Sequence, residues 1–331
     1  MTDSLAIGTF HAPADSTAET RMPWGALGLL LIIVIYALLL STRYAAAISE
    51  PDDNGYFAQG TLLAQTGRTW FVPESDAQYI GMHWLITPKG HYISRYPPGL
   101  AVLIGMLYLV GGYKAALLIN PALSVLALVG LFLLARRLVS VGWSLCAVLL
   151  MAANPVFVHH ALSGDSHMAV TFCVAWGLYL LVRWSQEGLL WQIFFAGVVL
   201  GCIPTIRYPD AIMALGFGAF VLWHAKRLPQ IGRHLVAALA GAAIPIIPLL
   251  VRNQLVLGAF WKTGYSLTNE QTGFSWEYFR EHALNYVTIL HSGGAGMMLA
   301  LGVIGITCMI CMRSTRPLGV MLALVTVPML L

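Results

Sequence analysis

Long apolar runs separated by short polar turns dominate the chain. A helix needs about 20 apolar residues, within a range of about 17–25, to cross a bilayer. Such runs predict transmembrane helices at Trp24–Ile48, Ala115–Ala135, Trp143–Leu162, Ser166–Val182, Gly188–Ile206, Tyr208–Ala225, Leu235–Val251 and Ser292–Met312. A further run, Pro317–Leu331, stops unfinished with the chain, which is typical of a fragment. The pattern predicts an all-α, polytopic transmembrane helical bundle over residues 24–331, with about nine spans.

The segment Pro97–Gly112 decides which loops share one side of the membrane. It is apolar, but it is short for a span and begins with two prolines. If it crossed, the basic clusters of the short loops would lie outside, against the positive-inside bias. If it is interfacial or re-entrant, those clusters fall inside and most acidic residues fall outside. We therefore predict extracytoplasmic loops at 49–113 and 252–291, and a disordered cytoplasmic tail at 1–23.

The composition agrees with a protein whose solvent is the bilayer. Of 331 residues, 58% are hydrophobic and only 10% are charged, whereas a soluble domain carries about 25% charged residues. The net charge of +4 is modest and gives no indication of a nucleic-acid partner. The five cysteines all lie inside apolar runs, with no spacing that suggests a disulfide framework.

The strongest local signal for chemistry directly follows the first predicted span. Glu50, Asp52 and Asp53 place three carboxylates within four positions. Ionised groups at a membrane are costly and usually functional, although a solvated turn is the simpler alternative. The following stretch Gly55–Gln65 has apolar residues at roughly helical spacing, which predicts a short interfacial helix.

A second acidic signal lies in the short turn that contains Ser163-Gly164-Asp165-Ser166-His167. An Asp in such a turn is a good helix cap, which needs no function. The predicted topology, however, places Asp165 on the same face as Asp52 and Asp53. Carboxylates from separate loops can divide acid and base work if their environments differ.

Cations recur in the predicted outer loops and are candidate ligands of a lipid phosphate. A guanidinium binds phosphate through paired hydrogen bonds, whereas a long basic side chain can also simply reach lipid headgroups. The candidates are Arg95, Arg207, Arg252 and Lys262. Several histidines fall on the same side, but no spacing among them is diagnostic of a metal, so a divalent metal stays open. They are His83, His91, His159, His160 and His167.

The order of these motifs resembles the GT-C superfamily of membrane glycosyltransferases. The similar features are Asp52-Asp53-x-x-Tyr56 after the first span, Tyr96-Pro97-Pro98-Gly99 before an apolar segment, and Asp165 in an outer turn. More narrowly, the chain is similar to the group of protein O-mannosyltransferases, aminoarabinose transferases and RgtA-like enzymes. The resemblance covers roughly residues 24–290, and it rests on the order of the motifs more than on any single one.

The resemblance implies a polyprenyl-phosphate sugar donor, a glycan, lipid or protein acceptor, and a multi-pass protein of the bacterial inner (plasma) membrane. It also implies an active site that faces the periplasm or exterior, and a single displacement there would invert the transferred carbon. Asp52 matches the first acid of the family's Asp-Glu pair, Asp53 replaces the Glu, and Asp165 matches the second-loop Asp. These three are the predicted catalytic residues. Tyr56 and Tyr96 join the four cations as predicted substrate-binding residues, although Arg95-Tyr96 stands where many members have Glu-Lys.

Two other classes of protein compete with a glycosyltransferase. A secondary transporter or lipid flippase would show repeat symmetry, broken helices and ionisable residues near the midplane. The predicted spans are nearly free of charge and show no internal repeat, although Asn154-Pro155, Pro204, Pro245 and Pro248 are candidate breaks or kinks. A non-catalytic subunit of a membrane assembly is the third alternative.

Overall fold

The computed structural model describes residues 23–48, 50–75, 81, 83–226, 229–268 and 276–330. Nearly all of the predicted tail at 1–23 lies outside these residues, as do Asp76 and Glu270 of the predicted outer loops. The α-helices are α1 (Pro23–Arg43), α2 (Pro51–Thr66), α3 (Gly99–Ala116), α4 (Ile119–Arg136), α5 (Val141–Ala152), α6 (Pro155–Leu162), α7 (His167–Glu187), α8 (Leu190–Gly201), α9 (Ile203–Ile206), α10 (Ala214–Ala225), α11 (Ile231–Leu257), α12 (Trp276–Leu290), α13 (Met297–Cys311) and α14 (Arg316–Leu330).

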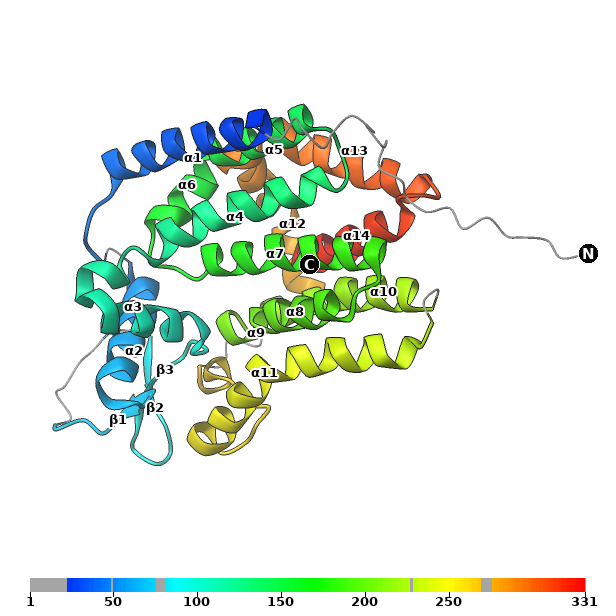
Figure 1. Ribbon diagram of the computed structural model, residues 1–331. Helices are drawn as coiled ribbons and strands as arrows, with labels where there is room; N and C mark the ends of the chain where they lie inside the picture. Colours follow the sequence, from blue (N-terminus) through cyan, green and yellow to red (C-terminus); the bar gives the residue numbers. More distant parts are fainter. Residues whose placement is uncertain are drawn as a thin grey trace, which may run out of the picture.

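Most of the long helices lie side by side and form a bundle (Figure 1). A helix satisfies every backbone polar group within its own segment, which is why uncharged runs adopt it in lipid. The interior is built mainly where α7 and α4, α8 and α7, and α11 and α8 pack together. Leu128, Leu181, Trp184 and Ile193 are among its fully buried side chains. Apolar residues on outer faces, as along α1, stay exposed, as expected for a lipid-facing surface.

Five described helices are long and apolar enough to cross a membrane: Trp24–Arg43, Gly99–Ala116, Ile119–Arg136, His167–Glu187 and Ile231–Leu257. The number rises to seven if each of two bent helix pairs is one span. Shorter apolar helices occupy Leu190–Ile206, Pro209–Ala225 and Arg316–Pro328, three further places where spans are predicted. The chain is therefore a mostly helical, multi-pass membrane protein, as the apolar runs indicate, whereas the total of nine spans stays a prediction.

Several boundaries differ from the predicted spans. Helix α1 ends at Arg43 instead of Ile48, and α11 continues to Leu257 instead of ending at Val251. The predicted break at Asn154-Pro155 is present as a 61° bend between α5 and α6. Proline ends the preceding helix because it removes a backbone donor, and the Asn154 side chain caps α6 by accepting from the N–H groups of Val156 and Phe157.

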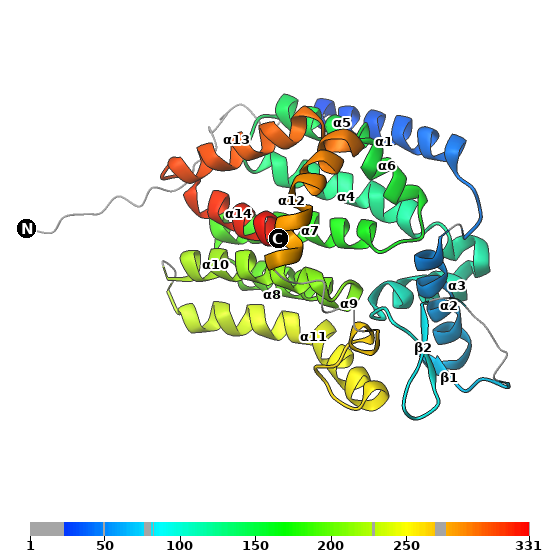
Figure 2. The same ribbon diagram turned by 180° about the vertical axis from the view of Figure 1, so that it is seen from behind.

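Helix α3 contains the segment predicted to be interfacial. It is kinked at Gly111 and Gly112, where Gly112 has φ +67°. In both views it lies with α2 at one end of the bundle, on the left in Figure 1 and on the right in Figure 2. It packs chiefly against α2. By length and composition it also qualifies as a span, so its interfacial placement remains a prediction that this position favours.

A small antiparallel sheet lies in the first long loop and is absent from the all-helical prediction. Its strands β1 (Trp70–Phe71), β2 (Trp84–Ile86) and β3 (Tyr92–Ser94) are ordered β1-β3-β2, with Trp70 opposite Ile93 and Trp84 opposite Ser94. Ile93 is fully buried in a cluster with Val256 and Leu257 of α11. The sheet thus holds the first long loop against the end of α11.

The second predicted loop, 252–291, contains the 3₁₀-helix η3 (Gly264–Leu267) and helix α12. The π-helix η5 (His291–Ala295) follows at the start of the predicted span Ser292–Met312, so that α13 begins only at Met297. A further 3₁₀-helix, η2 (Pro209–Met213), follows Arg207. Helix α12 is amphipathic, with none of its residues buried. The loop is therefore largely helical in its described part.

Two glycines allow three distant segments to meet at the same end of the bundle. A Cβ at Gly99 would lie 2.5 Å from the Thr205 carbonyl oxygen, and one at Gly264 would lie 2.0 Å from the Arg95 carbonyl oxygen. Only a residue without a side chain allows such an approach. The start of α3 thereby lies against the end of α9, and η3 lies against Arg95, between β3 and α3.

We expect Gly264→Ala to destabilise the protein by about 1–3 kcal/mol, because either η3 or Arg95 must move to admit the methyl group. The change would also displace Tyr265 from Arg95. Thermal unfolding in detergent measures the loss. Gly302→Ala is the matched control, because a Cβ there meets nothing within 4 Å and Ala favours a helix over Gly. Equal stability of the two variants would contradict the prediction.

Candidate active site

The two predicted acids of the first loop begin α2. Pro51 occupies the first turn, and Glu50 before it is extended, as a residue preceding proline prefers. Acids in a first turn also interact favourably with the helix dipole. Consecutive helical residues point in different directions, so Asp53 is buried with 2% exposure, whereas the Asp52 side chain is 50% exposed. The pair therefore occupies two different environments.

Asp53 faces the turn between α6 and α7. Ser163 Oγ lies 3.3 Å from Asp53 Oδ1 and donates to it. A cavity of about 20 Å³ beside Asp53 has room for about one water molecule. Burial raises the pKa of Asp53, and the nearby charges of Asp165 and Glu50 raise it further, against the lowering effect of hydrogen bonds from Gly164 and Ser163.

The raised pKa of Asp53 predicts that Asp53→Asn makes the protein more stable at neutral pH. The contribution of Asp53 to the free energy of unfolding is full below its ordinary pKa of 3.8. It is lost as the pH rises through the folded-state pKa, because the folded protein disfavours the ionised carboxylate. The neutral amide of the Asp53→Asn variant would not lose stability in this way. Unfolding midpoints of both proteins across acidic and neutral pH measure it. A stability difference that does not grow with pH would contradict the prediction.

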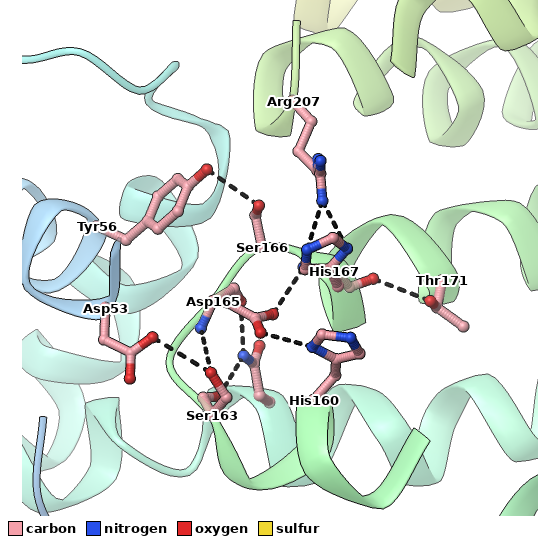
Figure 3. A network of polar contacts seen from close by, with 10 residues as sticks. Asp53, Tyr56, His160, Ser163, Asp165, Ser166, His167, Thr171 and Arg207 are labelled. Carbon is pink, nitrogen blue, oxygen red and sulfur yellow. Dashed lines mark hydrogen bonds and ion pairs between the residues drawn. The ribbon is translucent and has the colours of Figure 1, made fainter. Parts of the chain in front are cut away.

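Asp165 lies at the centre of a network that fixes the α6–α7 turn (Figure 3). His160 Nδ1 is 2.6 Å from Asp165 Oδ2, and the His167 backbone N–H donates to Oδ1 over 2.9 Å. Asn120 Nδ2 donates to the carbonyl oxygens of Ser163 and Asp165, both at 2.7 Å. Burial alone would raise the pKa of Asp165, but the hydrogen bond and charge of His160, with His167, lower it overall. The pKa values of Asp53 and Asp165 are therefore shifted in opposite directions.

Two tyrosines connect the acid pair to this turn. The Tyr56 hydroxyl donates to Ser166 Oγ over 3.0 Å, and the Tyr56 ring stacks on Tyr96 with centroids 4.4 Å apart. The Tyr96 hydroxyl donates to Asp52 Oδ1 over 2.6 Å. Burial raises the pKa of both tyrosines, so both hydroxyls keep their protons at neutral pH. His83 Nε2 lies 3.0 Å from the same Asp52 oxygen.

Two of the four predicted cations, Arg95 and Arg207, contact residues of this cluster. Arg95 lies over the rings of Tyr96 and Tyr265, at 5.0 and 5.6 Å from their centroids. Arg207 Nη1 lies 2.5 and 2.7 Å from the ring nitrogens of His167 (Figure 3), and its Nε is 3.5 Å from Asp210.

Arg252 and Lys262 have contrasting surroundings. Arg252 contacts Thr69 Oγ1 at 3.4 Å and Asn253 Oδ1 at 3.1 Å. Its Nη2 is buried without a hydrogen-bond partner among the described residues. Lys262 is exposed after α11, and within the described part of the chain no ion pair connects it to the site. Arg252 is thus the better-placed anion ligand of the two.

One group of described residues has a donor set that suits a metal ion. Ligand atoms of His160, Asp165 and His167 all lie within 4.8 Å of one another. Two imidazoles and a carboxylate suit a divalent transition metal, and the lowered pKa of Asp165 favours the ionised form that binds it. The residues fit a metal by their chemistry, although the Arg207 guanidinium lies against His167.

Several members of this network are absent from the site residues predicted from the sequence: Asn120, Ser163, Ser166 and Tyr265. Ser163 and Ser166 lie in the quoted turn motif around Asp165, but their contacts with Asp53 and Tyr56 depend on the packing of α2 against that turn. Asn120 had a detectable signal, because it is a polar residue within a predicted span, where such residues are rare and usually face the protein interior.

Comparison with known proteins relates the fold to one superfamily. Residues 95–251, slightly less than half of the chain, match the family model of the dolichyl-phosphate-mannose-protein mannosyltransferases. No curated protein matches the chain significantly in sequence.

Solved structures of the oligosaccharyltransferase from Archaeoglobus fulgidus share the fold. The structure with an inhibitory peptide and a dolichol-phosphate has a TM-score of 0.55 and 16% identity, over 90% of this chain and 46% of that one. The structure with Zn and sulfate gives 0.56 and 17%, over 90% and 45%. The structure tethered to an acceptor peptide gives 0.54 and 16%, over 89% and 45%. The chain spans less than half of these proteins, and it has the fold of the GT-C membrane glycosyltransferases, with a central part that resembles the protein mannosyltransferase family.

Proposed function

We propose that the protein transfers a sugar from a polyprenyl-phosphate donor to an acceptor hydroxyl on the extracytoplasmic face of the membrane. In a bacterium this is the periplasmic or outer face of the inner (plasma) membrane. The observation that carries the proposal is the meeting of the two acidic motifs, 110 residues apart, through Ser163 and Asp53. Arg207 and the Arg95–Tyr96 pair lie beside the same motifs.

The solved relatives support the class of donor. The archaeal oligosaccharyltransferase has been seen with a dolichol-phosphate and with an acceptor peptide. A polyprenyl phosphate has the same two parts, an apolar tail and an anionic head. The tail would lie among the exposed apolar helix faces, and the head would reach the cluster of arginines at the end of the bundle.

The transfer proceeds as a single displacement. The acceptor oxygen attacks the sugar carbon attached to the phosphate, and the carbon–oxygen bond to that phosphate breaks as the new bond forms. Polyprenyl phosphate leaves with the bonding electrons, and Asp52 takes the hydroxyl proton. The sugar carbon is inverted. The phosphate leaves as a stable anion, so no dedicated acid is needed to protonate it.

Arginines supply the electrostatic part of the mechanism. Charge grows on the departing phosphate, and fixed donors aimed at that charge lower the barrier. Arg252 offers a buried Nη2 that has no partner among the residues described, and Arg207 lies between Asp210 and His167. A divalent metal held by His160, Asp165 and His167 would add positive charge beside the carboxylates.

A transporter or flippase remains the competing function, and broken helices favour it. Pro245 and Pro248 lie inside α11, and α5 and α6 are bent by 61°. Discontinuous helices line the substrate site in many transporters. The two functions differ in their need for a gradient and in whether the donor is consumed.

The decisive experiment uses the full chain in detergent or nanodiscs, where no gradient exists. Radiolabelled polyprenyl-phosphate sugars are added with a membrane extract as the source of acceptors. Release of free polyprenyl phosphate above the level of a heat-treated sample would support transfer. Movement of intact donor between leaflets of proteoliposomes, without its consumption, would instead show a flippase and contradict the proposal.

A further inference from the structure

Asp52 carries two contacts on a single carboxylate oxygen. Tyr96 donates its hydroxyl to Oδ1 at 2.6 Å, and His83 Nε2 lies 3.0 Å from the same atom. A carboxylate accepts but cannot donate, so Nε2 of His83 carries the proton in this pair. Among the described residues, no hydrogen bond reaches Oδ2 of Asp52, and half of the side chain is exposed.

His83 is held in place by the sheet and by Tyr96. The Arg95 backbone N–H donates to the His83 carbonyl oxygen over 3.0 Å, which joins the start of β2 to the end of β3. The imidazole packs edge-on against the Tyr96 ring at 5.5 Å, and the His83 side chain is only 13% exposed. The ring therefore has little freedom to leave Asp52.

We propose that His83 is a positioning residue for Asp52 in the transfer reaction, an inference that rests on the proposed function. Together with Tyr96 it fixes Oδ1, so that Oδ2 is the atom presented to the acceptor hydroxyl. The proton of the acceptor passes to Oδ2, and His83 keeps its own proton throughout. The histidine acts only through the orientation of the carboxylate and contacts no substrate.

The contact of His83 with Asp52 would affect the rate through the geometry of proton transfer. A base is effective only within hydrogen-bond reach of the proton that it removes, and a misplacement of about 1 Å can cost about 100-fold in rate. An Asp carboxylate that accepts only one hydrogen bond can still rotate about its Cβ–Cγ bond. Two donors that converge on Oδ1 from different segments, Tyr96 after β3 and His83 before β2, restrict that rotation.

The test compares His83→Leu with His83→Gln at steady state, using the donor that the full chain is found to consume. We expect His83→Leu to lower kcat about 10- to 100-fold while KM for the donor changes by less than about twofold. His83→Gln keeps an N–H donor and should recover part of the rate. His91→Leu is the matched control, because His91 stacks on Trp70 in the same sheet and should leave kcat unchanged.

A double-mutant cycle separates positioning from a structural role. In the Asp52→Asn background, His83→Leu should cause little further loss of the residual rate, because the carboxylate it orients is absent. Additive losses would overturn the inference, and so would a normal kcat for His83→Leu. If His83→Leu does not fold, the same cycle is measured with His83→Gln and with Tyr96→Phe, each alone and in the Asp52→Asn background. Absence of any transfer by the wild type would contradict the proposed function itself and is thereby distinguished.

Discussion

Asp52→Asn is expected to lower sugar transfer by about 10²- to 10⁴-fold, the range that a positioned general base contributes. Asn has nearly the same shape as Asp but cannot accept a proton at neutral pH. Its carbonyl oxygen can still accept the hydrogen bonds from Tyr96 and His83 that now reach Oδ1. The loss should therefore appear in turnover, with donor affinity nearly unchanged.

Folding and catalysis are separable at this position because the Asp52 side chain is half exposed. Surface substitutions usually change stability by less than about 0.5 kcal/mol, so the unfolding midpoint of Asp52→Asn should match the wild type. Glu50→Gln is the matched control, since Glu50 is an exposed acid two positions earlier. Near-normal transfer by Asp52→Asn, or an equal loss in Glu50→Gln, would reject Asp52 as the base.

The helical part of the fold could be predicted from the sequence because each span carries its own signal. An uncharged run such as residues 119–135 must be helical wherever it lies in lipid. The sheet carries no comparable signal. Its strands are two or three residues long, and Ile93, which pairs with Trp70, is buried against Val256 and Leu257 of α11. Such pairing depends on tertiary contacts, and propensity over two residues is too weak to predict it.

In the site, too, some features could be predicted from the sequence and others depend on tertiary contacts. Asp52, Asp53 and Asp165 could be selected because carboxylates are conspicuous beside apolar runs. Their different environments could not be predicted, because burial of Asp53 depends on the α6–α7 turn docking on α2. The contact between His160 Nδ1 and Asp165 Oδ2 could not be predicted either. It depends on how α6 ends, and no spacing rule for metal ligands anticipates it.

Asp165→Asn is expected to damage activity and stability together, in contrast to Asp52→Asn. His160 is hydrogen-bonded to this carboxylate at 2.6 Å, and Asp165 is buried with 7% exposure. Loss of a charged hydrogen-bond partner at a buried site costs about 1–3 kcal/mol. Transfer should fall by at least about 100-fold, because the turn that carries Ser163 and Ser166 depends on this residue.

The difference in stability between the wild type and Asp165→Asn should depend on pH. The pKa of Asp165 is lowered in the folded protein, so its stabilising contribution is full above the ordinary value of 3.8 and is lost as the pH falls through the folded-state value. The stability gap between the wild type and Asp165→Asn should therefore be wide at neutral pH and narrow in acid. This is the opposite of the trend expected for Asp53→Asn.

Binding of zinc by the full chain gives Asp165→Asn a second readout. If His160, Asp165 and His167 hold a metal, the variant should lose most of its zinc affinity, as measured by competition with a fluorescent chelator. His159→Gln is the matched control, because His159 neighbours His160 but does not belong to the ligand group. Unchanged transfer and unchanged stability in Asp165→Asn would contradict the role given to this turn. A loss of transfer with no zinc binding in either protein would instead assign Asp165 to shaping the site alone, because its hydrogen bonds to His160 and to the His167 backbone need no metal.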